Sequence, residues 1–587
     1  MTRFETFTEL LLTRCADLGE KDAFIFMRDT TAGMQAERLT YAELDVAAKR
    51  VASWLVEIGA AGRQVLLLYP PGNDFVIAFA GCLYAGAVAV PAPLPGDQGT
   101  HFARVSGILQ DAQVRAVLTD SANEPGIAEW LARSGFTDVA SLATDRLDYG
   151  DAAAWTEPSI ATDDLAFLQY TSGSTSEPKG VMVSHHNLLA NEAAIQRSTG
   201  TNSDSRFGGW LPFYHDMGLI GHVLHPLWIG GSAALMSPVS FLKRPLRWLQ
   251  MIDEFDVTVG GGPNFAYDLC VRRVTEEQAA SLDLSRWVTA CNGAEPVRAE
   301  TLAAFTKHFA PSGFRPESFF PCYGMAETTL LISGTPMGRA PVLRVTDGAA
   351  LERGELRHPQ VGWAPRTLVS SGIIADQDFD VRVVDPETFQ AQPDGRVGEL
   401  WIKGDSVARG YWERPETNEE IFNARIAGAD AGWLRTGDLG VLESGQLYVT
   451  GRLKEMVLIN GRNLYPHDVE RTVQGIDAAL SIGGGAAFAV DSGQEHLVLV
   501  QEIKPNAPAA ADLPALASMV QSAISREFAV PAGNLLLVRP GTIRKTTSGK
   551  IQRTLMRKLF LAGELTPMHA VLEEPVRDLV DAARRAA

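Results

Sequence analysis

A loop rich in small hydroxyl residues follows an apolar strand that the sequence predicts. The run Leu165–Tyr170 leads into Thr171, Ser172, Gly173, Ser174, Thr175 and Ser176, and Lys179-Gly180 closes the loop. Backbone N–H groups of such a loop can surround phosphate oxygens, while hydroxyls donate hydrogen bonds and a lysine supplies charge. It is not a Walker loop, because GxxxxGK followed by Ser or Thr cannot be placed on it. The composition favours phosphate binding over an ordinary turn.

Four further motifs contain residue types suited to a nucleotide. In Tyr323-Gly-Met-Ala-Glu327 the aromatic ring can lie on a purine face, and the carboxylate can hold a divalent cation. In Arg435-Thr-Gly-Asp438 a carboxylate follows a tight turn and can accept hydrogen bonds from ribose hydroxyls. Gly451-Arg-Leu-Lys-Glu455 supplies a permanent cation, and Lys545-Thr-Thr-Ser-Gly-Lys550 places a lysine on a flexible loop. Each motif alone fits a structural role equally well, so the argument rests on their combination.

Together and in this order, the five motifs resemble those of the adenylate-forming superfamily of acyl-CoA synthetases, nonribosomal adenylation domains and luciferases. The resemblance covers roughly Tyr41 to Arg553. It implies an α/β fold, with a large N-terminal region of two doubly wound sheets plus a β-barrel-like subdomain, and a small mobile α+β C-terminal domain. We expect the AMP-binding domain at residues 1–453 and the mobile domain, with the catalytic lysine, at 454–587. The implied reaction joins a carboxylate to ATP, releases pyrophosphate, and then transfers the acyl group to a thiol.

Three features are similar to the fatty acyl-AMP ligase branch. The core His215-Asp216-Met217-Gly218 lies within Trp210-Leu-Pro-Phe-Tyr-His-Asp-Met-Gly-Leu-Ile-Gly221, and Gly461-Arg-Asn-Leu-Tyr-Pro-His-Asp-Val-Glu470 follows the hinge. Val345-Thr-Asp-Gly-Ala-Ala-Leu-Glu-Arg-Gly354 resembles the insertion of this branch, which we expect around residues 338–362. In that branch the insertion restrains the C-terminal domain and suppresses transfer to CoA. Glu455 departs from the commoner Asp but keeps its charge.

The resemblance assigns roles to individual residues. Lys550, Glu327 and His215 are expected to be catalytic, with ATP as cosubstrate and Mg²⁺ held by Glu327. Lys454 is the expected hinge. The expected nucleotide-binding residues are Thr171, Ser172, Gly173, Ser174, Thr175, Lys179, Asn292, Gly293, Ala294, Glu295, Tyr323, Gly324, Met325, Ala326, Asp438 and Arg452. The expected acyl pocket comprises His215, Asp216, Gly218, Leu219, Gly261, Gly262 and Pro263.

The surrounding pattern predicts the elements that position these motifs. Strand and helix patterns alternate in the first third: a helix at Tyr41–Gly59 capped by Thr40, a strand at Gln64–Tyr69, a helix at Phe75–Tyr84 and a strand at Ala87–Val90. Such alternation implies parallel sheets covered on both faces. From about Val381 short strands predict a β-rich subdomain, and after Gly451 a strand at His496–Ile503, a helix and a further strand predict a small α+β unit.

Composition narrows the functional classes. The chain has 587 residues and a formal net charge of −18, which argues against general nucleic-acid binding. Its five cysteines include no CxxC pair and its 11 histidines no HExxH, so we expect no structural zinc and a reducing, cytoplasmic compartment. No signal peptide is predicted, because Met1–Leu12 lacks a basic and then apolar layout.

Two uncharged runs are long enough to cross a bilayer. They are Phe75–Pro95, of 21 residues, and Gly218–Leu242, of 25 residues. Glycines and prolines interrupt both, so each is interpreted as a buried helix, a glycine break and a buried strand rather than a membrane span.

Several alternatives remain open from the sequence. The preferred function is activation of a fatty acid and transfer to a separate acyl carrier protein, by a monomer that acts in polyketide, nonribosomal peptide or lipid biosynthesis. A medium- or long-chain acyl-CoA synthetase, an amino-acid-activating domain and a catalytically dead nucleotide-binding scaffold are the competitors. The carrier would dock on a basic face that comprises Arg544, Lys545, Arg553, Arg557 and Lys558.

Overall fold

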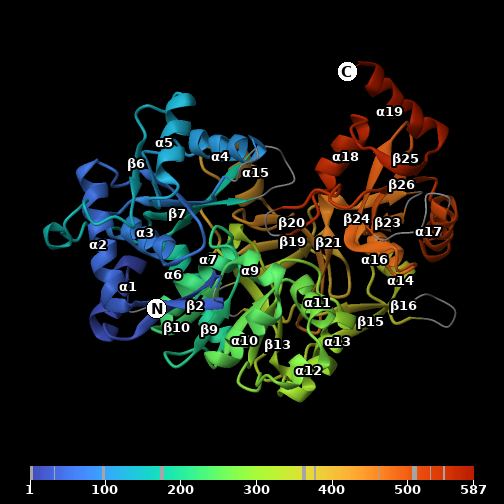
Figure 1. Cartoon of the computed structure of the whole chain (residues 1–587). Coiled ribbons are helices and arrows are strands. Elements are labelled where there is room, and N and C mark those ends of the chain that lie inside the picture. Colours follow the sequence, from blue (N-terminus) through green and yellow to red (C-terminus); the bar gives the residue numbers. More distant parts are fainter. Residues whose placement is uncertain are drawn as a thin grey trace.

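The fold is described from a computed structural model of the chain. It describes residues 4–31, 33–95, 99–171, 178–359, 365–375, 379–459, 462–505, 512–528, 530–546 and 549–586. Figure 1 shows the N-terminal sheets and helices on one side and the C-terminal segment, in orange and red, on the other.

A six-stranded sheet forms the first layer. Its order is β6-β5-β3-β4-β7-β8, parallel except for the antiparallel edge strand β8. The strands are β3 (Gln64–Tyr69), β4 (Val88–Pro93), β5 (Ala116–Thr119), β6 (Ala140–Ala143), β7 (Leu165–Thr171) and β8 (Lys179–Ser184). All six residues of β3 are buried, as expected for a central parallel strand covered on both faces.

A nine-stranded sheet forms the second layer. Its order is β17-β14-β13-β12-β11-β9-β10-β1-β2. The six neighbouring strands β13, β12, β11, β9, β10 and β1 run parallel to one another. The strands are β1 (Asp22–Thr30), β2 (Gly33–Thr40), β9 (Arg206–Gly209), β10 (Ser232–Met236), β11 (Val259–Gly262), β12 (Thr289–Asn292), β13 (Phe319–Gly324), β14 (Leu331–Gly334) and β17 (Ile373–Ile374). The two sheets confirm the predicted doubly wound α/β architecture.

Helices cover the sheets and also lie between them. They are α1 (Phe7–Leu18), α2 (Tyr41–Glu57), α3 (Asn73–Tyr84), α4 (Gly99–Asp111), α5 (Glu124–Arg133), α6 (His185–Thr199), α9 (Pro238–Lys243), α10 (Leu246–Glu254), α11 (Asn264–Arg273), α12 (Glu276–Ala280), α13 (Ala299–Phe309) and α15 (Pro415–Phe422). The predicted Thr40 cap is confirmed: its hydroxyl accepts from the Glu43 N–H, and the Glu43 carboxylate accepts from the Thr40 N–H.

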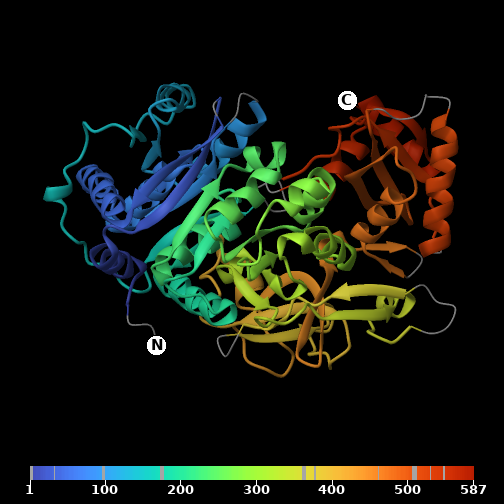
Figure 2. The ribbon, with the colours of Figure 1, turned by 60° about the horizontal axis from the view of Figure 1, so that its bottom comes forward.

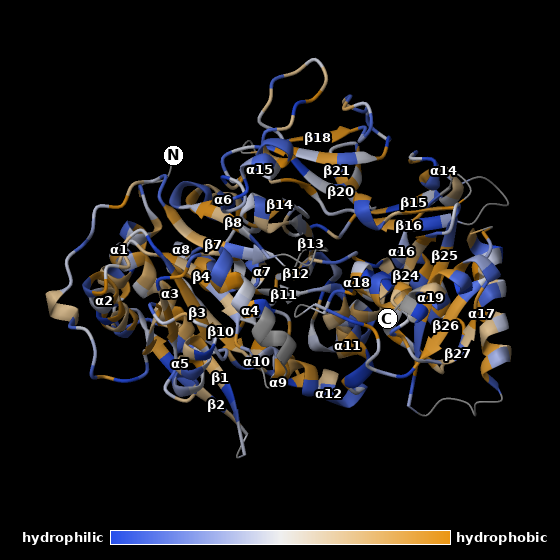
Figure 3. Cartoon of the chain, turned by 90° about the horizontal axis from the view of Figure 1, so that it is seen from above, coloured by the Kyte–Doolittle hydropathy of each residue, from blue (hydrophilic) through white to orange (hydrophobic). Residues whose placement is uncertain are grey.

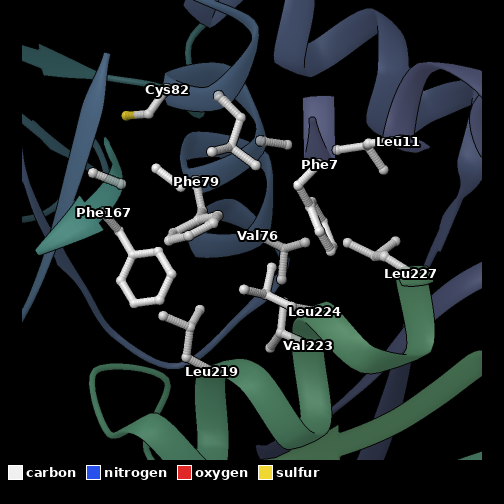
Figure 4. Close-up of a cluster of buried hydrophobic side chains, with 14 of the residues drawn as sticks. Phe7, Leu11, Val76, Phe79, Cys82, Phe167, Leu219, Val223, Leu224 and Leu227 are labelled. Carbon is white, nitrogen blue, oxygen red and sulfur yellow. The ribbon is translucent and has the colours of Figure 1, made fainter. Parts of the chain in front are cut away.

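The long apolar run after Gly218 folds as a helix, a glycine break and a strand, as predicted. Helix α7 (Asp216–Leu219) continues through a π-helical turn (Ile220–Leu224) into α8 (His225–Ile229), and Gly230, at a φ of 71°, ends the helix before β10. One face of this helical run packs in the main core (Figure 4), where Leu219, Val223 and Leu227 contribute. Among the described residues no helix is long and apolar enough to cross a membrane.

A β-rich subdomain follows the nine-stranded sheet. Strands β18 (Asp380–Val384), β19 (Gly398–Lys403), β20 (Leu434–Glu443) and β21 (Gln446–Arg452) form an antiparallel sheet in that order. Strand β17 of the large sheet packs against β21. In the described part of the chain the expected barrel-like subdomain is thus a four-stranded sheet that packs against its neighbours.

The C-terminal region is a compact α+β unit, as predicted. A hairpin, β22 (Val457–Ile459) and β23 (Arg462–Leu464), leads into the sheet β24-β25-β26-β27. The sheet strands are β24 (Leu480–Asp491), β25 (Glu495–Ile503), β26 (Asn534–Val538) and β27 (Pro567–Val571), and the helices are α16 (Pro466–Gln474), α17 (Leu513–Phe528), α18 (Arg553–Leu561) and α19 (Glu574–Ala586). Apolar residues concentrate on the strands, whereas α17 also carries polar residues (Figure 3).

The predicted insertion forms a hairpin that touches the C-terminal unit. It comprises β15 (Leu343–Asp347), α14 (Gly348–Glu352) and β16 (Pro365–Val369), and it extends toward α16 and β24 (Figures 2 and 3). Buried Arg366 pairs with Asp468 of α16, lies 3.7 Å from Glu352, and sits 5.1 Å from the ring centroid of Phe528. We call these contacts the Arg366 clamp.

Candidate active site

A cavity of about 630 Å³ brings together residues from both sheets, the β-rich subdomain and the C-terminal unit. Thr171, Lys179, Tyr323, Arg452 and Lys550 all line it. A second hollow, of about 700 Å³ between α16 and α17, contains none of the predicted site residues. The cavity that unites the motifs is therefore the candidate active site.

The end of the cavity that is predicted to hold phosphate lies at the ends of β7 and β8. Thr171 and Lys179 are cross-strand partners, which places a hydroxyl and an ammonium at the base of the predicted loop. Ser172, Gly173, Ser174 and Thr175 lie outside the described residues.

Glu327 lies beside this end in a buried hydrogen-bonded setting. Its Oε1 accepts from the Tyr411 hydroxyl at 2.7 Å, and the Lys179 ammonium lies 5.1 Å from the Tyr411 ring centroid. Burial raises the pKa of Glu327, although the Tyr411 hydrogen bond opposes the rise. Sequence reasoning missed Tyr411, which reaches the site because residues 410–412 pair with the edge of β8.

The residues predicted for the nucleoside form a triad of polar side chains. The Tyr323 hydroxyl donates to Asp438 Oδ2 at 2.8 Å, and Arg452 Nε donates to Asp438 Oδ1 at 2.8 Å. The Asp438 carboxylate raises the pKa of Arg452, and burial raises that of Tyr323. A carboxylate has about four acceptor positions, so Asp438 retains capacity for ribose hydroxyls.

The other predicted nucleotide residues divide into two groups. Gly293, Ala294, Gly324, Met325 and Ala326 line the cavity. The structure places Asn292 and Glu295 behind the lining: Asn292 is fully buried, and the Glu295 carboxylate accepts from the Phe265 N–H at 2.6 Å.

His215 and Asp216, which are predicted for the mouth of the acyl pocket, lie at the start of α7 and line the cavity. His215 Nδ1 lies 2.6 Å from Asp216 Oδ1, which also accepts from the Met217 N–H at 2.7 Å. Burial alone would raise the pKa of Asp216, but the charges of His215 and Lys550 lower it overall. Lys550 lines the same cavity as His215 and Asp216.

The loop that carries Lys550 is held by its own backbone. The Lys550 N–H donates to Thr546 Oγ1 at 3.0 Å, and the Thr546 N–H donates to the Lys550 carbonyl at 2.7 Å. Lys550 and Lys454, the predicted hinge residue, both line the cavity, so the C-terminal unit closes one side of it.

The acyl pocket differs from the expected wall. Its apolar lining includes Ile195, Phe207, Val259, Phe320 and Leu330, which come from five separate elements or their flanks. Gly218, Leu219, Gly261, Gly262 and Pro263 are outside this lining.

Packing explains the difference. Leu219 points into the main core toward Phe167 and Phe79 (Figure 4). A Cβ on Gly218 would meet the Pro212 carbonyl oxygen at 2.1 Å, and one on Gly261 would meet that of Cys291 at 2.1 Å, so both glycines permit close backbone approach. These glycines therefore allow the backbone to pack closely behind the cavity wall, and they do not line the cavity themselves.

Known proteins resemble the whole chain. Residues 12–412 match the family described as "AMP-binding enzyme", and residues 454–570 match "Disco-interacting protein 2-like, AMP domain". The chain is 39% identical over 577 residues to the medium-chain fatty acid–acyl-carrier-protein ligase JamA of Moorena producens, with 97% of each chain covered. It is 38% identical over 535 residues to the long-chain fatty acid–AMP ligase FadD26 of Mycobacterium marinum, covering 88% of this chain and 90% of that one.

A solved structure supports the same grouping. The crystal structure of a fatty acyl-adenylate ligase from L. pneumophila, in complex with acyl adenylate and pyrophosphate, is 36% identical with a TM-score of 0.74, covering 97% of this chain and 98% of that one. The chain therefore belongs to the AMP-binding enzyme family, and within it to the fatty acyl-AMP ligases. The predicted family, fold and use of ATP are confirmed.

Proposed function

We propose that this protein activates a fatty acid with ATP and passes the acyl group to the phosphopantetheine thiol of a separate acyl carrier protein rather than to CoA. The observation that carries the proposal is that Lys550, His215 and most of the described residues predicted to bind the nucleotide line one cavity. JamA, a relative along nearly its whole length, is named for this substrate class and acceptor.

The first step needs positive charge between two anions. A carboxylate oxygen attacks the α-phosphorus of ATP, the bond from that phosphorus to the bridging oxygen breaks, and pyrophosphate leaves with the electron pair. Unscreened repulsion between the anions costs several kcal/mol at bonding distance. The Lys550 ammonium, which lines the same cavity as His215 and Asp216, stabilises the charge that develops there. In the second step the carrier thiol attacks the acyl carbonyl and AMP leaves.

Glu327 suits a magnesium ion. Mg²⁺ usually keeps several waters and binds one or two carboxylates together with substrate phosphates, and a single oriented carboxylate beside the phosphate end fits that donor set. Bound there, the ion would neutralise charge on the departing pyrophosphate. Among the described residues no group of three or more His, Cys, Asp or Glu side chains forms a dedicated metal cage.

The Arg366 clamp supports selection against CoA. We assign residues 1–453 to the AMP-binding domain and residues 454–587 to a mobile domain that turns about Lys454. Rotation would pull Asp468 and Phe528 away from Arg366. The clamp therefore favours the arrangement in which Lys550 lines the cavity. Acyl transfer then needs an acceptor whose binding can break the contacts of the clamp.

The proposed docking face for the carrier is smaller than the sequence indicated. Arg544, Lys545, Arg557 and Lys558 are exposed. Arg553 instead pairs with Glu470 at 2.7 Å and Glu455 at 2.5 Å and is largely buried, so it anchors α18 to the hinge. The four exposed cations lie near Lys550 in the chain, and Lys558 also lines the cavity.

We further propose that the enzyme acts in the cytoplasm as a monomer. All five cysteines lie in the described part of the chain and none is in a disulfide. One chain supplies the motifs that line the cavity, so the proposed chemistry needs no residue from a second copy.

Mass analysis of products from ATP, a fatty-acid panel, CoA and a carrier protein tests the proposal. We expect acyl-adenylate and acylated carrier, with little acyl-CoA. Acyl-CoA as the main product would favour an acyl-CoA synthetase, and activation of amino acids alone would favour an adenylation domain. No pyrophosphate with any acid would indicate a catalytically dead scaffold.

A further inference from the structure

One end of the acyl cavity is polar, although much of its inner wall is apolar. Ile195, Phe207 and Val259 line the apolar part, but Thr199, His222 and His225 also line the cavity. A buried polar group without a partner is unfavourable, so a purely hydrocarbon ligand would leave this end poorly matched.

The polar end, at Thr199 and His225, lies far from the reacting carboxylate. His215 at the predicted mouth and His225 are ten residues apart on the continuous run of α7, the π-helical turn and α8. At an α-helical rise of 1.5 Å per residue, this run extends roughly 15 Å. Leu219, Val223 and Leu227 occupy the core face of the run (Figure 4), whereas His222 and His225 line the cavity.

A chain of hydrogen bonds fixes which atoms at this end can accept. The Thr199 hydroxyl donates to the Ile195 carbonyl at 2.7 Å, which uses its only proton. The 3.1 Å contact between Thr199 and Thr201 must therefore be a donation from Thr201. Since Thr201 has then used its own proton, it must accept from His225 Nε2 at 2.8 Å.

The same reasoning continues to Glu192. His225 Nε2 carries a proton, and Nδ1 lies 2.5 Å from Glu192 Oε2, so one more proton lies between ring and carboxyl. Both side chains are almost completely buried. Every hydroxyl or ring proton in this series of hydrogen bonds is already used, so the series offers a ligand no donor. Thr199 Oγ1, however, keeps a second lone pair that can accept.

His222 lies on the same helical run, but its unpartnered nitrogen is closed off from the cavity. Its Nδ1 is buried and has no partner among the described residues. Burial lowers the pKa of His222 to about 4, and a hydrogen bond with the Met217 backbone opposes this shift. The ring is therefore neutral at physiological pH, its proton is on the nitrogen that faces Met217, and a ligand in the cavity does not reach Nδ1.

We propose that this pocket selects a fatty acid that carries a hydroxyl group at or near its ω end, which donates a hydrogen bond to Thr199 Oγ1. The inference rests on the proposed function and specifies its substrate class. An end that offers an acceptor but no donor favours a hydroxyl over a methyl group. It also disfavours a second carboxylate, which could only place acceptor against acceptor beside Glu192.

Pyrophosphate release with three acids tests the proposal: decanoic acid, ω-hydroxydecanoic acid and decanedioic acid, with shorter and longer members of each series. We expect kcat/KM for the ω-hydroxy acid to exceed that for the unsubstituted acid by about tenfold or more at the best chain length, because an unpaired polar site rejects the analogue without the hydroxyl. The dicarboxylic acid should be the poorest substrate. Thr199→Val should remove most of the ratio of kcat/KM between the ω-hydroxy acid and decanoic acid.

Thr119→Val is the matched control, because Thr119 is also buried and its hydroxyl donates to a backbone carbonyl, that of Leu68 at 2.6 Å. It should leave the substrate preference unchanged. Equal or better use of the unsubstituted acid at every length, or ready use of the dicarboxylic acid, overturns the inference while leaving the proposed function intact. If no acid releases pyrophosphate, the proposed function fails, and this inference fails with it.

Discussion

The two ends of the cavity are built in different ways. At the nucleotide end, partners are close in the chain or on adjacent strands: Asp438 and Arg452 face each other across β20 and β21, and Thr171 and Lys179 across β7 and β8. At the acyl end, the wall comes from α6, β9, β11 and the segments around β13 and β14, which lie far apart in the chain. The first end is defined by motifs and the second by packing.

This difference predicts two kinds of mutational effect. At the nucleotide end Thr171, Lys179, Tyr323, Arg452 and Lys550 are partly or fully exposed, and the charged groups there act on charge, so variants there should change rates. Acyl-end polar groups are buried in the core between the sheets, so variants there should change stability and chain preference.

The largest expected effect is on stability, from Glu192→Ala. The change leaves His225 buried without the carboxyl that it contacts. Removal of one member of a buried ion pair lowers the free energy of unfolding by about 3–5 kcal/mol. The free energy of unfolding, from urea titration, measures it. Glu129→Ala, which breaks an exposed pair with Arg133, should cost no more than about 1 kcal/mol. A similar small loss for both variants would contradict the comparison.

The next largest effect is on rate, from Lys550→Ala. We expect pyrophosphate release to fall by on the order of 10²-fold or more, as loss of a transition-state donor typically does. ATP binding should weaken far less, because Tyr323, Asp438 and Arg452 remain. Rapid-quench assays and equilibrium ATP binding separate the two, with the exposed Lys504→Ala as control. Near-normal turnover would refute the assignment of Lys550.

Arg366→Ala should change the acceptor rather than the adenylation rate. Without the clamp the C-terminal unit is freer to turn, so we expect several-fold more acyl-CoA and little change in pyrophosphate release. Product analysis with CoA measures this. The control is Arg382→Ala, which removes only an exposed pair with Asp380. Unchanged acyl-CoA would place the restraint elsewhere.

Tyr411→Phe should reduce pyrophosphate release by about tenfold, because a hydrogen bond to a charged group contributes about 1.5–3 kcal/mol. The hydroxyl lowers the pKa of Glu327. Its loss therefore raises that pKa, and the acid limb of the pH–rate profile should move to higher pH. Tyr149→Phe, whose hydroxyl donates to the Thr144 carbonyl, should leave the profile in place.

The smallest effect concerns the docking face. Charge reversal of Arg557 and Lys558 to Glu should slow transfer to an acidic carrier several-fold, more at low salt, while pyrophosphate release stays intact. Transfer rates at several salt concentrations measure the effect. If transfer is equal at every concentration, the carrier docks on another surface.

Most of the described residues that the sequence predicted for the nucleotide line the cavity, whereas most of those that it predicted for the acyl wall do not. Tyr323, Asp438, Arg452 and Lys550 lie in motifs, because their chemistry depends on residues a few positions apart. Tyr411 was missed because it reaches Glu327 only through pairing with β8. Leu219 was misplaced because helical spacing does not say which face meets the core, and the π-helical turn after it shifts that spacing further.

The insertion hairpin has a consequence for acceptor choice. If its contacts hold the C-terminal unit with about 3 kcal/mol, fewer than about one molecule in a hundred is turned at any moment. A carrier protein can offset that cost with the interface it forms, whereas CoA presents a much smaller surface. The restraint that the Arg366 clamp imposes on the C-terminal unit would thus discriminate by the size of the acceptor's contact area. The reacting thiol is the same in the carrier protein and in CoA.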